Sequence, residues 1–438
     1  MPRLRTITTA ALAVLALAGG GLAGAPHPAE ARAGQGGGSA WFTSWAQSQQ
    51  DAATDPLRDQ SVRTVTHLSQ GGDGVRVRIQ NTFGTAPLEI GGASVGLSGD
   101  GASIKGDTHP VRFDGKTHVT VPAGGEVWSD PAGLDTAAQD DVAVSVALKG
   151  TATPGQHRTA LRTNYLTPEG TGDHTADTNG ASYTKTVDAT YLISAVDVHN
   201  PRLKGTSVAY GSSVVDGVGS TNCGPGCTET GTNRRWTDDL ARRVHTELPR
   251  TEQVAIANAG LSGTTSAADC PGTPSNVQGL DAATRLKRDV LALHGVTSVL
   301  YYYGTNDLAF GCDGEQILAS YKKVFKELRD AGITIYVTPI TPRPGYTDQN
   351  NLDRHTVNLF TKKASSCDGI CEGVMDFDEV LKDPLHPNSI KPSYDNGDGV
   401  HANIAGQQAI ADSISLRMLT AGVDAEAGAG AGAGAATR

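Results

Sequence analysis

The sequence predicts a two-domain protein in which a β-sandwich or jelly roll precedes an α/β domain with a parallel sheet and flanking helices. Over residues 40–200, short segments alternate apolar and polar residues, with Gly, Pro and Asp clusters between them, a pattern typical of antiparallel strands. Over residues 204–420, apolar runs alternate with amphipathic segments, as strands and helices do in a parallel sheet. A chain of 438 residues is long enough for both domains.

Residues 1–33 are expected to be a secretory signal peptide. Arg3 and Arg5 precede an apolar run, and the small-residue sequences Ala-Glu-Ala and Ala-Arg-Ala follow at residues 29–33. The alternative is a membrane anchor, but the strongly apolar part is shorter than the ~20 residues that span a bilayer. No later segment is apolar enough to span one. The sequence therefore predicts a secreted, extracellular protein with no membrane span.

The composition suits a soluble globular protein and argues against a nucleic-acid partner. Hydrophobic residues make up 38% and charged residues 19% of the chain, and the net charge is -10, whereas binding to a polyanion requires a basic surface. Residues 425–438 are a Gly/Ala repeat with almost no core-forming side chain. We expect this tail to be disordered.

In the first domain, three segments alternate apolar and polar residues most clearly: Val75–Ile79, His118–Val121 and Val142–Leu148. No amphipathic helix separates them, which favours an antiparallel sandwich or jelly roll. In the second domain the expected strands are Ser207–Tyr210, Val254–Ala257, Ser298–Tyr303, Ile333–Pro339 and Val374–Phe377. Apolar residues on one face predict a helix over Glu315–Gly332, and a final helix is expected over Gly406–Leu419.

Six cysteines lie in the second domain: Cys223, Cys227, Cys270, Cys312, Cys367 and Cys371. In an exported chain they are expected to form disulfides. The close Cys-x3-Cys spacing favours pairing within the first two and within the last two, leaving Cys270 for Cys312. A zinc site is the alternative, but neither pair is accompanied by a matching histidine pair.

Polar residues follow several of the expected parallel strands, and the carboxyl ends of such strands meet in one crevice. A hydroxyl nucleophile needs a base, and the base needs a group that orients it. Ser213, His401 and Asp398 can fill these three roles. The backbone N–H groups of Gly263 and Ser213, with the side-chain amide of Asn306, can stabilise an oxyanion.

These loops resemble four ordered sequence blocks of SGNH/GDSL-type esterases. The blocks read Gly211-Ser-Ser-Val-Val-Asp-Gly217, Asn258-Ala-Gly-Leu-Ser-Gly263, Gly304-Thr-Asn-Asp307 and Asp398-x-x-His401. The resemblance covers roughly Thr206 to Leu419, and four ordered blocks are far more specific than any single one. It implies a flavodoxin-like sheet, Ser213 as nucleophile, and Gly263 and Asn306 as oxyanion donors. The strand-rich first half resembles, more loosely, the N-terminal sandwich of some secreted members.

One residue departs from the family pattern, because Ser212 stands where the family has Asp before its nucleophile. The change removes an acceptor that can brace N–H groups of neighbouring loops, a task that the Ser212 hydroxyl can perform only in part. We expect Ser212 and Asp307 to have structural roles. The three tyrosines over residues 301–303 are expected to alternate between the two faces of a central strand.

The predicted function is a secreted serine hydrolase that cleaves carboxylic esters, with acyl or acetyl groups on carbohydrate or lipid as candidate substrates. The predicted reaction requires no metal or organic cofactor. Two alternatives remain open at this point: an acyltransferase that uses the same residues, and a carbohydrate-binding protein whose catalysis has weakened. Nothing in the sequence demands an assembly larger than a monomer.

Overall fold

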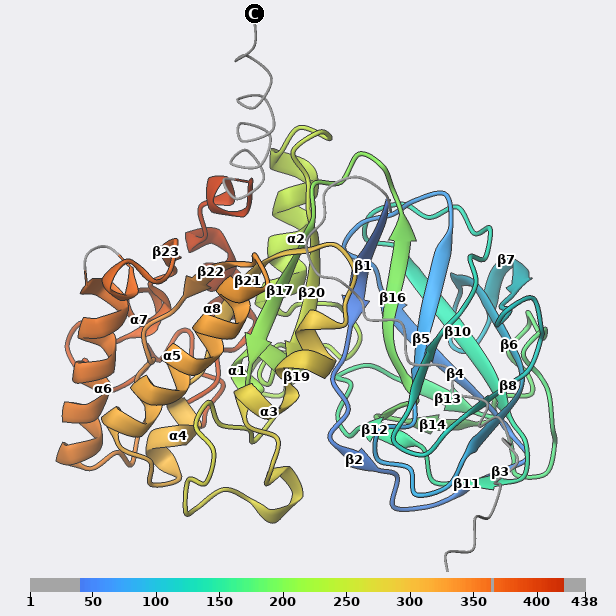
Figure 1. The fold of residues 1–438 in the computed structure, drawn as a ribbon, viewed down its shortest axis with the longest axis horizontal. Helices are drawn as coiled ribbons and strands as arrows, with labels where there is room; N and C mark the ends of the chain where they lie inside the picture. The colour runs from blue at the N-terminus through green and yellow to red at the C-terminus, as the bar shows by residue number, and fades with distance from the viewer. Residues whose placement is uncertain (1–39, 364–365, 421–438) are drawn as a thin grey trace, which may run out of the picture. The chain divides into compact units, whose positions relative to one another are not determined.

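The computed structural model describes residues 40–363 and 366–420. The expected signal peptide at residues 1–33 and the Gly/Ala tail at residues 425–438 lie outside this part of the chain. The strand-rich region and the α/β region that follows it belong to one compact unit (Figure 1). Within residues 40–363 and 366–420, no helix has the length and apolar character that crossing a membrane requires.

The strand-rich region contains two main antiparallel sheets, as the sequence predicts. The four-stranded sheet has the order β1 (Trp41–Ala46), β16 (Ile193–His199), β5 (Val75–Gln80) and β9 (Glu126–Trp128). The seven-stranded sheet has the order β14 (Lys185–Val187), β13 (Asn164–Leu166), β4 (Ser61–His67), β10 (Asp141–Leu148), β6 (Leu88–Ser98) and β7 (Ile104–Pro110), with β8 (Val119–Val121) also paired to β6. Shorter pairings join β2 (Asp51–Ala52), β3 (Leu57–Arg58), β11 (Thr151–Ala152), β12 (Gly155–His157) and β15 (Thr190–Tyr191).

Apolar residues of both sheets form a shared core. Val77 and Val196 of the four-stranded sheet cluster with Val95 and Val144 of the seven-stranded sheet, and all four are fully buried. The alternating residues of β10 therefore face this core, as their pattern predicts. The opposite face of β10 is also buried, because the Arg63 side chain lies over it and its Nε donates a hydrogen bond to Ser145 Oγ (2.8 Å).

The α/β region is built on a five-stranded sheet in which all neighbouring strands are parallel. Its order is β20 (Ala255–Gly260), β17 (Thr206–Gly211), β21 (Val296–Tyr302), β22 (Thr334–Val337) and β23 (Gly373–Val374). Numbered along the chain this order is 2-1-3-4-5, the flavodoxin-like arrangement, in which ligands bind beyond the carboxyl ends of the strands. The predicted fold class is confirmed.

Helical segments cover both faces of this sheet. They are α1 (Ser213–Asp216), α2 (Trp236–Glu247), η1 (Ser275–Val277), α3 (Ala282–Leu286), η2 (Lys287–Leu291), α4 (Thr305–Ala309), α5 (Gly314–Asp330), α6 (Asp348–Lys362), η4 (Cys367–Gly369), α7 (Phe377–Leu381) and α8 (Ile404–Ser413). One core cluster joins α3, η2, α5 and α6 to Tyr301 and Tyr303. The other joins α2, α7 and α8 to Tyr302. The predicted alternation of the three tyrosines is confirmed.

Two helices were predicted by range, with different outcomes. The expected helix over Glu315–Gly332 is α5, whose first turn is closed by a capping box between Asp313 and Gln316. The expected final helix over Gly406–Leu419 is interrupted, because α8 ends at Ser413 and residues 414 and 415 are not helical, while residues 416–420 are helical again. Arg243 Nη1 donates to the carbonyl oxygens of Ala411 and Ile414 (2.6 and 2.9 Å), satisfying acceptors that end with the helix.

The edge strand β20 contacts the strand-rich region. The Ile256 N–H donates to Ser69 Oγ (3.0 Å), and Gln70 Nε2 donates to the Val254 carbonyl oxygen (3.3 Å). Strand β1 also packs against β20. Two polar backbone groups at this edge of the parallel sheet therefore find partners in the strand-rich region.

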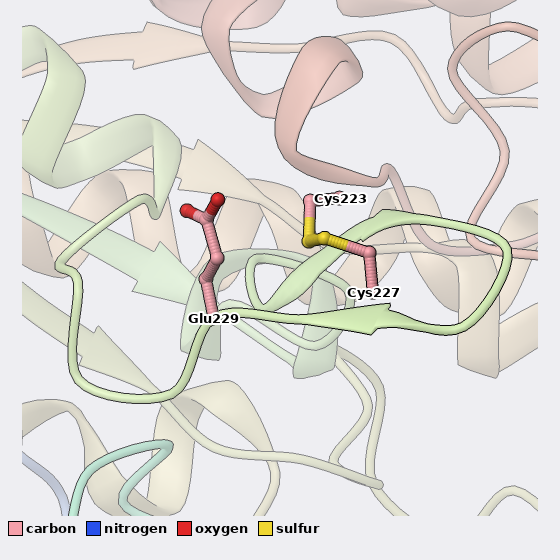
Figure 2. A group of neighbouring side chains, drawn as sticks. All are labelled: Cys223, Cys227 and Glu229. Carbon is pink, nitrogen blue, oxygen red and sulfur yellow. A yellow bond between two sulfur atoms is a disulfide. The ribbon is translucent and has the colours of Figure 1, made fainter.

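The six cysteines form three disulfides: Cys223–Cys227, Cys270–Cys312 and Cys367–Cys371. These are the pairs that the spacing favours. Within the part of the chain that the structure describes, Cys223, Cys227 and Glu229 form the one group of clustered potential metal ligands. Figure 2 shows that the two sulfur atoms of this group are bonded to each other, so they offer no thiolate to zinc.

Candidate active site

Ser213 lies where the parallel strand β17 passes into the short helix α1. Gly211 ends β17, and a Cβ atom there would stand 2.3 Å from the Tyr302 carbonyl oxygen. Only glycine allows the two strands to approach this closely at that point. The turn places Ser213 at the carboxyl edge of the sheet, with 8% of the residue exposed.

The structure brings the three sequence-predicted triad residues into direct contact. His401 Nε2 lies 2.8 Å from Ser213 Oγ, and His401 Nδ1 lies 2.6 Å from Asp398 Oδ2. A carboxylate can only accept, so Nδ1 carries the hydrogen, and in the neutral ring Nε2 is left as the acceptor for the Ser213 hydroxyl. This is the geometry in which a histidine can take a proton from a serine.

Asp398 both closes its own turn and orients the histidine. Its Oδ1 atom accepts hydrogen bonds from the N–H groups of Val400 (2.8 Å) and His401 (2.9 Å). Partial burial acts to raise the pKa of Asp398, but hydrogen bonds from the His401 ring and from these N–H groups bring the pKa below its usual range. The Asp398 carboxylate therefore stays ionised at neutral pH.

The predicted oxyanion donors occupy the loops after two neighbouring strands. Gly263 follows β20 with a φ of +83°, a conformation that favours glycine. Asn306 lies in α4 and is 6% exposed, and its Nδ2 donates to the Thr264 carbonyl oxygen (3.0 Å), tying the two loops together. The structure pairs neither the Gly263 N–H nor the Ser213 N–H with an acceptor among the residues that it describes.

The orientation of the Asn306 amide is fixed by an arginine that the sequence did not reveal. Arg343 Nη1 donates to Asn306 Oδ1 (3.0 Å). Because the oxygen faces a guanidinium, the nitrogen points the other way, and its second hydrogen remains available to a ligand. Arg343 lies in a Pro-rich loop after β22, outside the four sequence blocks. Its spacing from Asn306 therefore gave no sign of the contact.

Ser212 does not act through its hydroxyl at the start of α1. The N–H groups of Val215 and Asp216 donate to the Ser212 carbonyl oxygen (3.0 and 2.9 Å), and the side chain makes no capping hydrogen bond. The carboxylate that binds the neighbouring loop belongs to Asp216, whose Oδ2 accepts from the N–H (3.1 Å) and Oγ–H (2.5 Å) of Ser262. Asp216 belongs to the first sequence block, so the sequence contains this carboxylate, but its position in the block does not indicate which loop it binds.

Asp307 braces the same region from the other side. Its carboxylate accepts hydrogen bonds from the N–H groups of Ser266 (3.0 Å) and Ala267 (2.7 Å). Asp307 is fully buried, and this burial raises its pKa to about 6 although both hydrogen bonds act to lower it. These contacts are structural, since they hold the loop that continues from Gly263.

A buried arginine joins the strand ends beneath Ser213. Arg285 Nη2 donates to the Gly211 carbonyl oxygen (2.7 Å), and Nη1 donates to the carbonyl oxygen of Ala259 and to Asp289 Oδ2 (both 2.9 Å). Burial disfavours the charge of Arg285, but Tyr210, Tyr303 and Asp289 raise its pKa above the usual range. The ends of β17 and β20 are thereby fixed by one cation, for which the sequence offered no signal.

Residues 209–409 match the GDSL-like lipase/acylhydrolase family, whereas no curated protein matches the chain. Similar solved structures include a lipase/acylhydrolase from Enterococcus faecalis (16% identity, TM-score 0.37, covering 50% of this chain and 96% of that one). A carbohydrate acetylesterase from Sinorhizobium meliloti is also similar (15%, TM-score 0.35, covering 51% and 99%).

A further similar structure is a family two carbohydrate esterase from Clostridium thermocellum, solved in complex with cellohexaose (14% identity, TM-score 0.37). The similarity covers 87% of this chain and 99% of that one. The family match spans all four loops described above, from Ser213 to His401. Residues 209–409 of the chain therefore match a GDSL-like lipase/acylhydrolase domain, which supports a carboxylic ester hydrolase.

Proposed function

We propose that this protein is a secreted serine esterase in which Ser213, His401 and Asp398 carry out the chemistry. The observation that carries the proposal is the unbroken contact from Ser213 Oγ through the His401 ring to Asp398, at 2.8 and 2.6 Å. Beside it lie the N–H groups of Ser213 and Gly263, which bind no acceptor within residues 40–363 and 366–420.

In the first half of the reaction, Ser213 Oγ attacks the ester carbonyl carbon while His401 Nε2 takes the hydroxyl proton. The negative charge that develops on the carbonyl oxygen is stabilised by the N–H groups of Ser213 and Gly263 and by Asn306 Nδ2. His401, held by Asp398, then gives its proton to the leaving alcohol, which leaves the acyl group on Ser213.

In the second half, water replaces the alcohol. His401 takes a proton from the water, which attacks the acyl carbonyl, and the same donors stabilise the second tetrahedral intermediate. The imidazolium returns the proton to Ser213 Oγ as the acid leaves. All proton transfers therefore pass through one nitrogen, His401 Nε2.

Secretion and substrate class are part of the proposal. Secretion is supported by the basic residues and apolar run before residue 33 and by three disulfides, which form in oxidising compartments. For the substrate we propose acyl or acetyl esters of a carbohydrate or lipid. We also propose that the protein acts as a monomer. A screen of acetylated sugars and of aryl esters with graded chain length identifies the preferred acyl group and alcohol.

The direct test of the nucleophile compares two adjacent serines. We expect Ser213→Ala to abolish hydrolysis of a short-chain aryl ester and labelling by a fluorophosphonate, because both require the Ser213 hydroxyl. Ser212→Ala should keep both, because its side chain makes no capping contact. The reverse result, an active Ser213→Ala with an inactive Ser212→Ala, would assign the nucleophile to Ser212.

A further inference from the structure

A histidine of the strand-rich region contacts the turn that carries the nucleophile. His157 ends the short strand β12, and its Nε2 lies 3.1 Å from Asp216 Oδ1 at the end of α1. Both side chains are almost fully buried, at 1% and 5% exposure. The ion pair therefore forms inside the molecule, where little water competes for either charge.

The surroundings of the ring favour the imidazolium form. His157 Nδ1 lies 2.8 Å from the Ser48 carbonyl oxygen, which can only accept, and Nε2 faces the Asp216 carboxylate, which also accepts. Nε2 makes a close ionic contact with Asp216 but no aligned hydrogen bond. A neutral ring that donates from Nδ1 would turn the Nε2 lone pair toward the carboxylate, so the positively charged ring is favoured. Burial acts against this charge, but Asp216 and the Ser48 carbonyl outweigh it and raise the pKa of His157 above its usual value of 6.5.

The other charged groups near this ring come from two further segments. Arg235, which precedes α2, acts to lower the pKa of His157, and its Nε donates to the Asp216 carbonyl oxygen (2.8 Å). Asp188, between β14 and β15, is also close enough for the two charges to attract each other. For Asp216, burial favours the neutral form, but His157 and the Ser262 hydroxyl bring the pKa below its usual value of 3.8.

The contacts continue from Asp216 to the loop after β20, which contains Ser262 and Gly263. Asp216 Oδ2 accepts from both the N–H and the Oγ–H of Ser262, and the N–H of Gly263 belongs to the next peptide. Gly260 brings this loop close to α1, because a Cβ atom there would stand 2.1 Å from Asp216 N. Holding both donors of Ser262 therefore restricts the conformation of this residue, which precedes the peptide that carries the Gly263 N–H.

We propose that His157 is a positioning residue for the esterase site: its imidazolium holds Asp216, and Asp216 holds Ser262 so that the Gly263 N–H stays aimed at the oxyanion. Asp216 thereby supplies a loop-bracing carboxylate in the first sequence block, where Ser212 stands in place of the Asp of the SGNH/GDSL pattern. The inference rests on the proposed function. It assigns the strand-rich region a part in the reaction, since that region provides His157.

The pH range of this arrangement follows from the two pKa shifts. The pKa of His157 is raised, so its contribution is complete below pH 6.5 and is lost as the pH rises through the raised value. The pKa of Asp216 is lowered, so its contribution is complete above pH 3.8 and is lost as the pH falls through the lowered value. Loss of the imidazolium at alkaline pH should loosen Ser262 and reduce kcat.

The test measures kcat and KM for a short-chain aryl ester from about pH 6 to about pH 10, a range that includes the raised transition of His157. The variants are His157→Gln, which keeps an N–H donor without the charge, and Ser262→Ala, which removes one donor to Asp216. The matched control is His174→Gln, from a partly exposed pair with Asp177 in the same region (2.8 Å). Fluorophosphonate labelling gives the concentration of active sites, and thermal melting reports folding.

We expect His157→Gln to lower kcat per labelled site by about tenfold with little change in KM, because a misaimed donor weakens only transition-state binding. The alkaline decline of kcat that we expect for the wild type should disappear in this variant. Ser262→Ala should lower kcat by a smaller factor, and His174→Gln should match the wild type in kcat and in pH profile.

The proposal is overturned if His157→Gln keeps the kcat per labelled site and the pH profile of the wild type, even where its melting temperature falls. If His157→Gln does not fold, Ser262→Ala decides, and an unchanged kcat in that variant overturns the proposal. Failure of the proposed function is a different result, since a wild type that neither hydrolyses esters nor reacts with the fluorophosphonate would show it without any variant.

Discussion

The contact between Arg343 and Asn306 shows how one side chain determines what its neighbour can do. An amide can offer either its oxygen or its nitrogen to a ligand, and only the nitrogen stabilises an oxyanion. Arg343 binds the oxygen at 3.0 Å, while the Thr264 carbonyl binds one hydrogen of the nitrogen. The two contacts together leave Asn306 one productive orientation, and the guanidinium adds positive charge beside the site.

Replacing Arg343 by Met should therefore lower kcat by about tenfold while KM changes little, because the lost contact matters most when the oxyanion forms. Asn306→Ala should cost more, about 10²- to 10³-fold, since it removes the donor itself. Steady-state kinetics on an aryl ester measures both. Arg329→Met, at an exposed pair with Glu372, is the control, and a kcat for Arg343→Met equal to that of the control would contradict this account.

Among single residues, the sequence predicts the location of those that directly follow a parallel strand. Ser213, Gly263 and Asn306 each lie just after a parallel strand, so the rule for such sheets gathers them at one edge. Arg285, Arg343 and His157 reach the site from other segments. Their contacts depend on how distant parts of the chain pack, and no local pattern in one sequence contains that information.

The loop that carries Asp398 and His401 is anchored by the first residue before α8. Asn403 caps this helix through Oδ1, which accepts from the Gly406 N–H (3.0 Å). Its Nδ2 donates to the carbonyl oxygens of Ser393 and Asp395, both at 3.1 Å. One side chain thus serves the helix and the catalytic loop at the same time.

We expect Asn403→Ala to lower the free energy of unfolding by about 1–2 kcal/mol through loss of the cap, and also to lower kcat several-fold, on the order of 1 kcal/mol in transition-state energy. Asp313→Ala, which removes the cap of α5, is the matched control. It should cost about 1 kcal/mol of stability and leave kcat unchanged. Chemical denaturation and kinetics measure the two effects, and an Asn403→Ala variant with unaltered kcat would show that the loop does not depend on this anchor.

The bounds of a helix could be predicted where its apolar residues repeat with the helical period and a nearby residue caps it. They could not be predicted where residues distant in the sequence determine the end of the helix. The α5 helix has both an apolar face and its own capping box, so its sequence is sufficient to place it. The apolar residues after α8 suggest one unbroken helix, but the helix is interrupted at residues 414 and 415, where Arg243 on α2 binds the freed carbonyl oxygens. In β10, Arg63 of a neighbouring strand covers the face that alternation would leave to solvent.

For the whole molecule, the disulfides should contribute unequally to stability. Cys270–Cys312 closes a segment with a sequence separation of 42, which includes α3 and α4, whereas Cys367–Cys371 has a separation of 4. All four cysteines are buried, so the two pairs differ mainly in loop length. A longer closed loop restricts the unfolded chain more strongly.

Replacing Cys270 and Cys312 together by Ala should lower the free energy of unfolding by about 4 kcal/mol, against about 2 kcal/mol for the Cys367 and Cys371 pair, by the chain-entropy relation. Guanidinium unfolding of the two double variants, each compared with the wild type, measures both values. Equal losses would indicate that local packing, and not loop length, sets the contribution of each disulfide.

The pairing of β20 with the strand-rich region has a consequence for the solubility of any separated half. An edge strand with bare N–H and C=O groups is a template to which other chains can add a strand. Here Ser69 binds the Ile256 N–H of β20, and Gln70 binds the carbonyl oxygen of Val254, the residue before β20, so the strand-rich region covers part of this edge. We expect an α/β half that is expressed without the strand-rich region to self-associate through this edge. After a proteolytic cut between the two regions, we expect the strand-rich region to stay bound to the edge, so that both halves remain in solution as a complex.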